Sequence, residues 1–129
     1  MLGPGGDVLA PDGSAYLVAV RNSPKGSNSL LAVPVAGGQP RTLVRLKQPE
    51  HFLAGFAWSP DSRYVYFPRT DNSGTDLLRV PASGGPVEST PLHMPTIRNL
   101  SIHPDGKRIA FQSGDPDWEL WALDGFLSQ

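Results

Sequence analysis

One twelve-residue pattern occurs three times in this chain of 129 residues, and it constrains the fold more than any other feature. Each copy contains a Pro-Asp pair, one or two turn-forming residues and then an alternating apolar run. The copies cover residues 8–19, 56–67 and 100–111. Proline presets the backbone for the first corner of a tight turn, and aspartate or glycine suits the next corners. Each copy therefore predicts a hairpin turn that leads into a β-strand.

A second apolar segment follows each copy at a similar distance. Leu31, Leu78 and Trp121 occupy equivalent positions in these segments and are separated by 47 and 43 residues. Gly-Gly follows the first two segments and Asp-Gly follows the third. A period in the forties that is built from short strands is typical of propeller blades. The sequence predicts an all-β fold, a partial β-propeller of about three four-stranded antiparallel blades, the last incomplete.

The repeat also sets the expected limits of the blades. Blade one is predicted at residues 1–47, blade two at 48–91 and the incomplete blade three at 92–129. Strands are expected near Asp7–Ala10, Ala15–Val20, Ser29–Val35, Arg41–Leu46, Leu53–Trp58, Arg63–Pro68, Asp76–Val80, Val87–Thr90, Thr96–Ile102, Arg108–Gln112 and Glu119–Leu123.

Alternate turns of an antiparallel meander lie at opposite ends of the strands. The Pro-Asp turns and the Gly-Gly turns are therefore expected at one end, which we name the turn end. The opposite end, which we name the loop end, is expected to carry three long loops and two blade crossings. Because varied loops on a rigid scaffold usually carry the binding function, the loop end is the predicted binding face. The loops are residues 21–28, 69–75 and 113–117, and the crossings are residues 45–53 and 91–96.

Composition limits the class of partner and of site. The net charge of −1 gives no electrostatic reason to expect a nucleic acid or an anionic membrane as partner. The chain has no cysteine, which excludes disulfides and thiolate metal sites and suits the cytoplasm and the periplasm alike. No apolar run approaches the roughly 20 residues that span a bilayer. The first six residues lack the basic start and apolar centre of a secretion signal.

The best-formed copy of the repeat resembles the TolB-type WD-like propeller repeat. It reads Trp58-Ser59-Pro60-Asp61, then an apolar strand and a loop, then Leu77-Leu78-Arg79-Val80-Pro81 and Gly84-Gly85. The resemblance covers nearly all of residues 7–125. Blade three matches it closely at residues 104–111, whereas blade one has Ala10 in the serine position. The resemblance implies a propeller fold, usually of six blades, and the matching residues are structural ones.

The end of the chain adds a second resemblance. Residues 120–127 are similar to the closing segment of propellers that follow a winged-helix DNA-binding domain or a protein kinase domain in bacterial regulators. This similarity implies that residue 129 is near a natural end and that residue 1 is not a natural start. Propellers of the same type also precede prolyl-peptidase catalytic domains, which implies a second setting for the chain.

Three blades create a packing problem. Each blade of a repeat protein buries its faces only against its neighbours, so both end blades would expose an apolar face and bare strand edges. Propellers usually close with four to eight blades. The chain is therefore expected either to be part of a longer propeller or to pair with a second copy in a six-bladed ring, and self-association of the isolated chain is predicted.

Several polar residues invite a chemical interpretation next to a structural one. Asp12, Asp61 and Asp105 recur at one turn position, where aspartate bonds its own backbone, so we interpret them as turn residues. His51 and His93 lie in the predicted crossings, and a metal pair there has no supporting spacing.

Two loops and three tryptophans leave further alternatives open. Residues 71–76 alternate oxygen donors around a glycine as a calcium loop does, but a plain hairpin is the default. Trp58 and Trp121 fall on strand positions that are expected to pack between blades, whereas Trp118 flanks a loop and could anchor a ligand.

The sequence contains no cysteine nucleophile, no Gly-x-Ser-x-Gly and no phosphate-binding glycine motif. We therefore predict a non-enzymatic module that binds a protein or peptide, without catalytic residues, metal or cofactor. The alternative is a gate or sensor for a hydrolase or kinase on the same natural chain. The predicted binding residues at the loop end are Arg45, Lys47, His51, Arg69, Asp71, His93 and Asp117.

Overall fold

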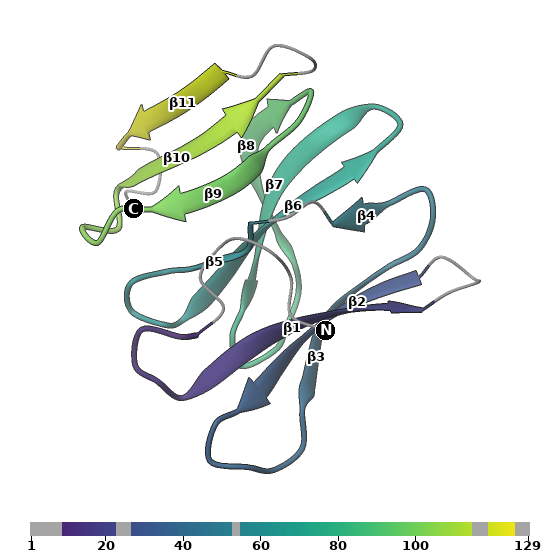
Figure 1. The fold of residues 1–129 in the computed structure, drawn as a ribbon, viewed down its shortest axis with the longest axis vertical. Helices are drawn as coiled ribbons and strands as arrows, with labels where there is room; N and C mark the ends of the chain where they lie inside the picture. Colours follow the sequence, from purple (N-terminus) through teal and green to yellow (C-terminus); the bar gives the residue numbers. More distant parts are fainter. Residues whose placement is uncertain (1–8, 23–26, 53–54, 115–118, 126–129) are drawn as a thin grey trace.

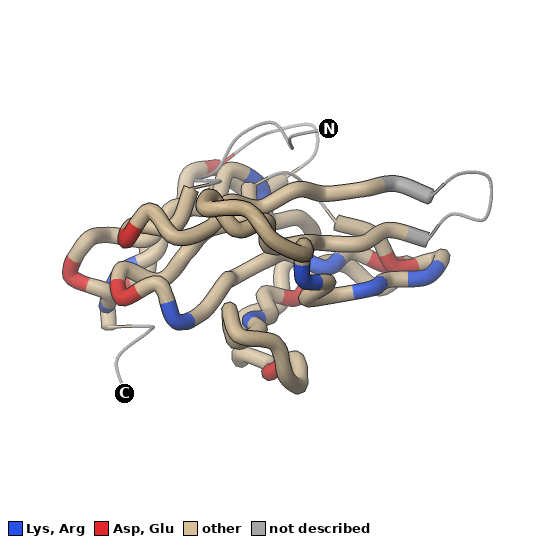
Figure 2. The backbone as a smooth tube through the Cα atoms, turned by 90° about the horizontal axis from the view of Figure 1, so that it is seen from below, with Lys and Arg blue, Asp and Glu red and all other residues tan. Residues whose placement is uncertain are grey.

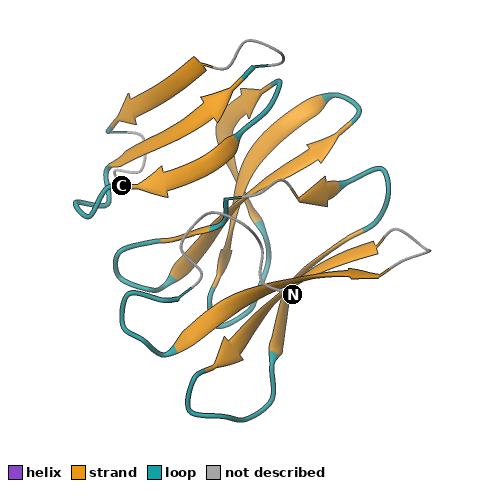
Figure 3. Cartoon of the chain, viewed as in Figure 1, coloured by secondary structure: helices purple, strands orange, loops and turns teal. Residues whose placement is uncertain are grey.

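A computed structural model of the chain describes residues 9–22, 27–52, 55–114 and 119–125. These residues form β-strands and turns, with no helix among them and hence none that could cross a membrane (Figure 3). The first sheet has the order β1 (Ala15–Asn22), β2 (Ser27–Pro34), β3 (Arg41–Leu46). The middle sheet contains β4 (His51–Phe52), β5 (Ala57–Trp58), β6 (Tyr64–Asp71), β7 (Gly74–Pro81) and β8 (Glu88–Met94). The third sheet has the order β11 (Glu119–Asp124), β10 (Arg108–Ser113), β9 (Arg98–Ile102).

The three sheets are antiparallel and fan out in chain order, with the middle sheet between the other two (Figure 1). This arrangement confirms the predicted all-β fold of a partial propeller. The limits of the blades at residues 47 and 91 stay a prediction.

The strands expected at the inner edge of the first two blades are described only in part. In the first sheet the described part is a single bridge between Leu9 and Tyr16, and residues 7 and 8 lie outside the described ranges. In the middle sheet the described part of the strand expected at residues 53–58 is β5, and residues 53 and 54 lie outside the described ranges. The short strand β4 comes before them, and both β4 and β5 pair with β6. Gly55 lies between them with a φ of 106°, a conformation that interrupts a strand ladder.

The Pro-Asp turn has the same hydrogen bonds in each blade, which confirms the structural interpretation of its aspartates. A backbone amide just before the turn donates to a carbonyl just after it: Ala10 to Ala15 at 2.8 Å, Ser59 to Tyr64 at 2.8 Å and His103 to Arg108 at 2.9 Å. The aspartate Oδ1 accepts a bond from the amide two residues on: Ser14 at 2.9 Å, Arg63 at 3.0 Å and Lys107 at 2.8 Å. These bonds reach only a few residues along the chain, so each copy of the sequence can form its turn alone.

Strand pairing places the turns where the meander predicted them. Ala15 pairs with Pro34 and Tyr64 pairs with Pro81, so each Gly-Gly turn lies at the same end as the Pro-Asp turn of its blade. Adjacent turns also touch, because the backbone amide of Asp12 donates to Ser62 Oγ at 3.1 Å. The turn end is therefore confirmed.

The hydrophobic core consists of two layers, one on each face of the middle sheet. The successive side chains of β6 point to opposite faces of the middle sheet, and both faces are buried. This explains why residues 64–68 are a continuous apolar run. The layer against the first sheet includes Leu17, Leu30, Ala32, Val44, Trp58, Val65, Phe67, Leu78 and Val80. The layer against the third sheet includes Ala57, Tyr66, Leu77, Ile97, Leu100, Ile109 and Phe111.

The two tryptophans expected in the core differ. Trp58 is buried in the layer against the first sheet, which confirms its prediction. Trp121 remains 39% exposed, so the expectation that it packs between blades is wrong in part. Its ring lies parallel to that of Phe111, with 6.4 Å between centroids and 6° between planes. Trp121 therefore neighbours Phe111 within its own sheet while its side chain keeps contact with solvent. Trp118 lies outside the described residues.

Candidate functional site

The loop end differs from its prediction because the strands run further than the sequence pattern indicated. Strand β6 continues to Asp71 and β7 begins at Gly74, so the segment 69–75 is a hairpin with a two-residue turn and not a long loop. Polar residues continue the ladder here by pairing with one another across the strands. Thr70 Oγ1 and Thr75 Oγ1 lie 2.8 Å apart, for example.

The two predicted crossings also contain strand residues. Strand β8 continues through Pro91 to Met94, which places His93 opposite Asp76 and not in a crossing. Because β8 is an edge strand with a register shift against β7, its proline is tolerated there. His51 likewise lies in β4, paired with Thr70. The connection between the first and middle sheets is therefore only residues 47–50.

Four charged or titratable side chains from neighbouring segments form one bonded cluster at the loop end, which we name the β6–β8 cluster. Arg69 Nη2 donates to Asp76 Oδ2 at 3.0 Å, and Arg69 Nη1 lies 3.6 Å from Glu50 Oε2. His93 Nδ1 lies 2.6 Å from Asp76 Oδ1. Asp76 therefore connects an arginine on β6 to a histidine on β8, and the cluster comprises Glu50, Arg69, Asp76 and His93.

Both ring nitrogens of His93 face hydrogen-bond acceptors. Besides the Asp76 carboxylate at Nδ1, the carbonyl oxygen of Ser73 lies 3.1 Å from Nε2. Only the doubly protonated imidazolium can donate to both acceptors. The hydrogen bond to Asp76 is the main reason that the pKa of His93 is raised above its ordinary value of 6.5. The same contact is the main cause that lowers the pKa of Asp76.

Asp71 stabilises the turn beside this cluster. Its Oδ1 accepts bonds from the amide of Ser73 at 2.8 Å and from the hydroxyl of Ser73 at 2.7 Å, and these bonds lower the pKa of the carboxyl. The carboxylates of Asp71 and Asp76 thus have separate protein partners. The pairing of Asp71 with Gly74 and of Thr70 with Thr75 shows that residues 71–76 form a hairpin. The described residues contain no group of three His, Cys, Asp or Glu that could hold a metal.

The structure brings together only part of the predicted binding set. Arg69 and His93 are in the β6–β8 cluster, and Asp71 lies in the turn next to it. His51 pairs with Thr70 on the neighbouring strand. The remaining three are placed as follows: Arg45 on β3 opposite Ser29, Lys47 just after β3, and Asp117 outside the described residues.

Sequence reasoning missed Glu50 and Asp76 as members of the cluster. The sequence pattern places Asp76 at the start of a strand, and its role depends on the register that places it opposite both Arg69 and His93. A two-residue turn at Asn72 and Ser73 would have given that register. Glu50 had no signal in the sequence, because its proximity to Arg69 follows from the path of the chain between two sheets.

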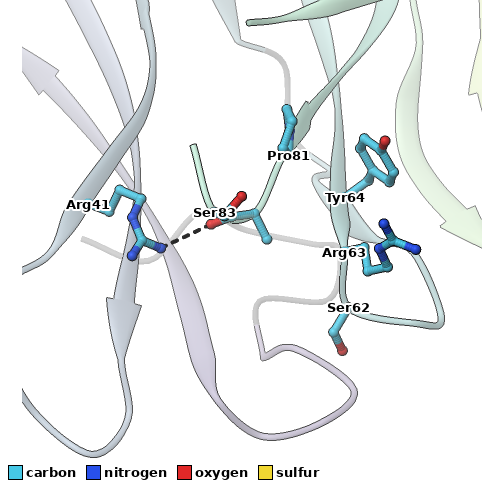
Figure 4. A pocket seen from close by; sticks show the side chains of 7 residues that line it. Arg41, Ser62, Arg63, Tyr64, Pro81 and Ser83 are labelled. Atoms are coloured by element: carbon cyan, nitrogen blue, oxygen red, sulfur yellow. Dashed lines mark hydrogen bonds between the residues drawn. The ribbon is translucent and has the colours of Figure 1, made fainter. Parts of the chain in front are cut away.

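A shallow hollow lies at the opposite end of the molecule, between the first and middle sheets. It has a volume of about 440 Å³ and is lined by Arg41, Ser62, Arg63, Tyr64, Pro81, Ala82 and Ser83 (Figure 4). Arg41 Nη1 donates to the carbonyl oxygen of Ala82 at 3.1 Å across it. None of the predicted binding residues lines this hollow. Over the described backbone as a whole, cationic and anionic residues are interspersed (Figure 2).

We expect the stability of the chain to depend on the charge of His93. Because its pKa is raised in the folded state, its contribution is complete below about pH 6.5 and is lost as the pH rises through the raised value. In thermal unfolding between about pH 6 and pH 8.5, the difference in Tm between the wild type and His93→Gln should decrease as the pH rises.

The control for this prediction is the variant Asp76→Asn, which should return the pKa of His93 towards its ordinary value. NMR of the ring protons of His93 measures this pKa. A His93 pKa at or below 6.5 in the wild type would show that the contact with Asp76 does not hold in solution.

The fold can now be compared with known structures. No family model matches the sequence, and no curated protein matches it significantly. The structure is similar to that of a TolB from Agrobacterium tumefaciens, with a TM-score of 0.74 and 19% identity over 90% of this chain. TolB from Acinetobacter baumannii gives a TM-score of 0.73 and 15% identity over 95% of this chain.

A third similar structure is prolyl oligopeptidase B from Galerina marginata, with a TM-score of 0.60 and 11% identity over 90% of this chain. The chain spans 43% and 30% of the two TolB structures and 18% of the oligopeptidase. The repeat, the three fanned sheets and these similarities lead to one conclusion: the chain has the fold of part of a TolB-type β-propeller.

Proposed function

We propose that the chain is a non-catalytic propeller module that binds a protein or peptide at its loop end. The observation that carries the proposal is the β6–β8 cluster. Its side chains are held by mutual bonds yet remain partly exposed: the exposed fractions are 29% for Arg69, 31% for Asp76 and 50% for His93. Polar groups that are already fixed before binding lose less conformational entropy when a partner arrives.

The proposed contacts are the full set predicted for the loop end, and both signs of charge are present in this set. A partner segment with alternating polar and charged groups would suit such a surface better than a segment of one charge. The proposed contacts are Arg45, Lys47, His51, Arg69, Asp71, His93 and Asp117.

The test uses peptides selected from a random library displayed on phage, with the chain as the immobilised target. The double variant Lys47→Ala, His51→Ala removes two exposed side chains of the loop end. Truncating most single interface residues costs less than about 1 kcal/mol, so we expect the two truncations together to cost about 1.4 kcal/mol and to raise the Kd of the selected peptides about tenfold. Isothermal titration calorimetry measures this change.

The chain offers a matched control at the turn end. His103 and Lys107 are also exposed and lie in the Pro-Asp turn of the third sheet. The variant His103→Ala, Lys107→Ala changes the same two residue types, and it should leave the Kd unchanged. If the control weakens binding and the loop-end variant does not, the binding surface is at the turn end.

A gate or sensor attached to a hydrolase or kinase is the second candidate. The similarity to prolyl oligopeptidase B supports it, because that chain is a peptidase by name and this chain matches 18% of it. Sequencing the coding region on both sides of this segment separates the candidates. An adjoining hydrolase domain favours the gate, and an adjoining kinase or winged-helix domain favours the sensor part of a regulator.

We also propose that two copies of the chain can pair to complete a six-bladed ring. The support is that each sheet in the fan has two large faces, and the first and third sheets each have a neighbour on one face only among the described residues.

A further inference from the structure

The two outer faces of the fan differ in kind, and they can be compared with the faces that already pack inside it. We name the face that a sheet turns to the next sheet its forward face, and the face that it turns to the preceding sheet its rear face. The first internal contact joins the forward residues Leu17 and Leu30 to the rear residues Val65 and Phe67. The second joins the forward residues Tyr66 and Leu77 to the rear residues Ile109 and Phe111.

Leu120 occupies a forward position that is deeply buried in the other two sheets. The repeat spacings of 47 and 43 residues make Leu30, Leu77 and Leu120 equivalent. Leu30 and Leu77 are each 0% exposed, whereas Leu120 is 77% exposed. Because the next sheet covers both of its repeat equivalents, the exposed leucine indicates a face that is built to pack against a further sheet.

The first sheet presents the complementary surface. Because Leu17 points to the middle sheet, strand alternation turns Tyr16 and Val18 to the rear face, and their strand partners Val33 and Leu31 share that face. All four side chains are partly exposed. Their repeat equivalents on the rear face of the middle sheet, Val65, Phe67, Leu78 and Val80, are all buried. On the third sheet the equivalents Ile109 and Phe111 are buried, whereas Trp121 is 39% exposed.

The side chains at one pair of facing positions on the two outer faces are matched in size. Position 110 on the third forward face is alanine, where the internal forward faces have Leu17 and Tyr66. Position 16 on the first rear face is tyrosine, where the internal rear faces have Val65 and Ile109. A smaller residue on one face thus coincides with a larger residue on the other, as facing positions of a packed interface require.

From these observations we infer that the outer forward face around Leu120 binds the outer rear face around Tyr16 and Val18 of a second copy of this chain. This inference rests on the proposed pairing of two copies and specifies its contact. The contact is head to tail, so a two-fold arrangement forms it twice and leaves neither face open. It also repeats the type of contact that already holds the three sheets together.

The experiment measures molar mass by light scattering during size-exclusion chromatography. The wild type is expected at twice the chain mass of 13.9 kDa, and Leu120→Glu is expected at the single mass. Leu120 is too exposed for its replacement to affect the fold, which circular dichroism verifies. The control Val87→Glu changes another exposed apolar residue, 42% exposed and before β8, and should leave the double mass intact.

A mixing experiment then tests the head-to-tail geometry. Val18→Lys alone should also give the single mass. An equimolar mixture of Val18→Lys and Leu120→Glu should recover the double mass, because one of its two contacts then has wild-type faces and the other joins lysine to glutamate. A pair that joined two forward faces, or two rear faces, would give a different result. Only one of the two substitutions would then lie in the contact, so the other variant alone would keep the double mass.

A wild type at the single mass, a Leu120→Glu variant at the double mass or a mixture that stays single would each overturn the inference. If the wild type forms oligomers of more than two chains and Leu120→Glu abolishes them, the inference that two copies form a closed pair would also be overturned. Neither Leu120 nor Val18 belongs to the predicted binding set of the loop end. The result of the pairing experiment is therefore independent of the result of the peptide-binding experiment.

Discussion

Replacing Phe67 with alanine is expected to lower the free energy of unfolding by about 3–5 kcal/mol, the usual loss for a fully buried phenylalanine. Phe67 is 0% exposed and lies in the core layer between the first and middle sheets. Its ring meets Phe52 edge to face, with 5.8 Å between centroids, and Phe52 meets Phe56 in the same way at 5.5 Å. The truncation therefore leaves a cavity and removes one ring of a connected aromatic group.

This loss would be a large part of the total stability, since small domains are stable by only about 5–15 kcal/mol. Urea unfolding followed by tryptophan fluorescence is a direct measurement, because Trp58 lies in the same core layer. Val35→Ala is the control, because Val35 is 54% exposed, and it should change stability by no more than about 0.5 kcal/mol. If Phe67→Ala costs less than about 1 kcal/mol, the first and middle sheets do not pack as described.

Replacing Gly55 with alanine should damage the contact between the middle and third sheets. The φ of Gly55 is 106°, a conformation that costs an alanine about 1–3 kcal/mol. A Cβ there would also lie 2.8 Å from the backbone nitrogens of Asn99 and Leu100. Both atoms are backbone atoms of β9, so the third sheet would have to move as a whole to relieve the clash.

Gly38 separates the two contributions. Its φ of 114° is similar, but a Cβ there would have no atom within 4 Å. Gly38→Ala therefore measures the backbone strain alone, and Gly55→Ala should lower the unfolding free energy further by at least about 1 kcal/mol. Amide hydrogen exchange should locate this extra loss in β9 and β10. Equal losses for the two variants would mean that Gly55 does not approach β9 in solution.

The loop end shows where sequence reasoning reached its limit. Two of the predicted binding residues, Arg69 and His93, belong to one bonded cluster at the loop end, which is the predicted binding face. The prediction of a long loop at residues 69–75 was wrong. Polar residues in sequence resemble a loop, and only the pairing of Arg69 with Asp76 and of Thr70 with Thr75 shows that they extend a ladder. The cluster depends on that register, so its bonds could not be derived from spacing alone.

The amino-acid sequence by itself determined the repeated hairpin and the all-β fold. These features depend on bonds over a few residues and on alternation along one strand, which each copy of the repeat carries within itself. The tertiary structure alone decided which polar residues meet at the loop end and how fully Leu120 and Trp121 are exposed. Those outcomes depend on the register between strands and on the presence of a neighbouring sheet, and both arise between segments that are distant in the chain.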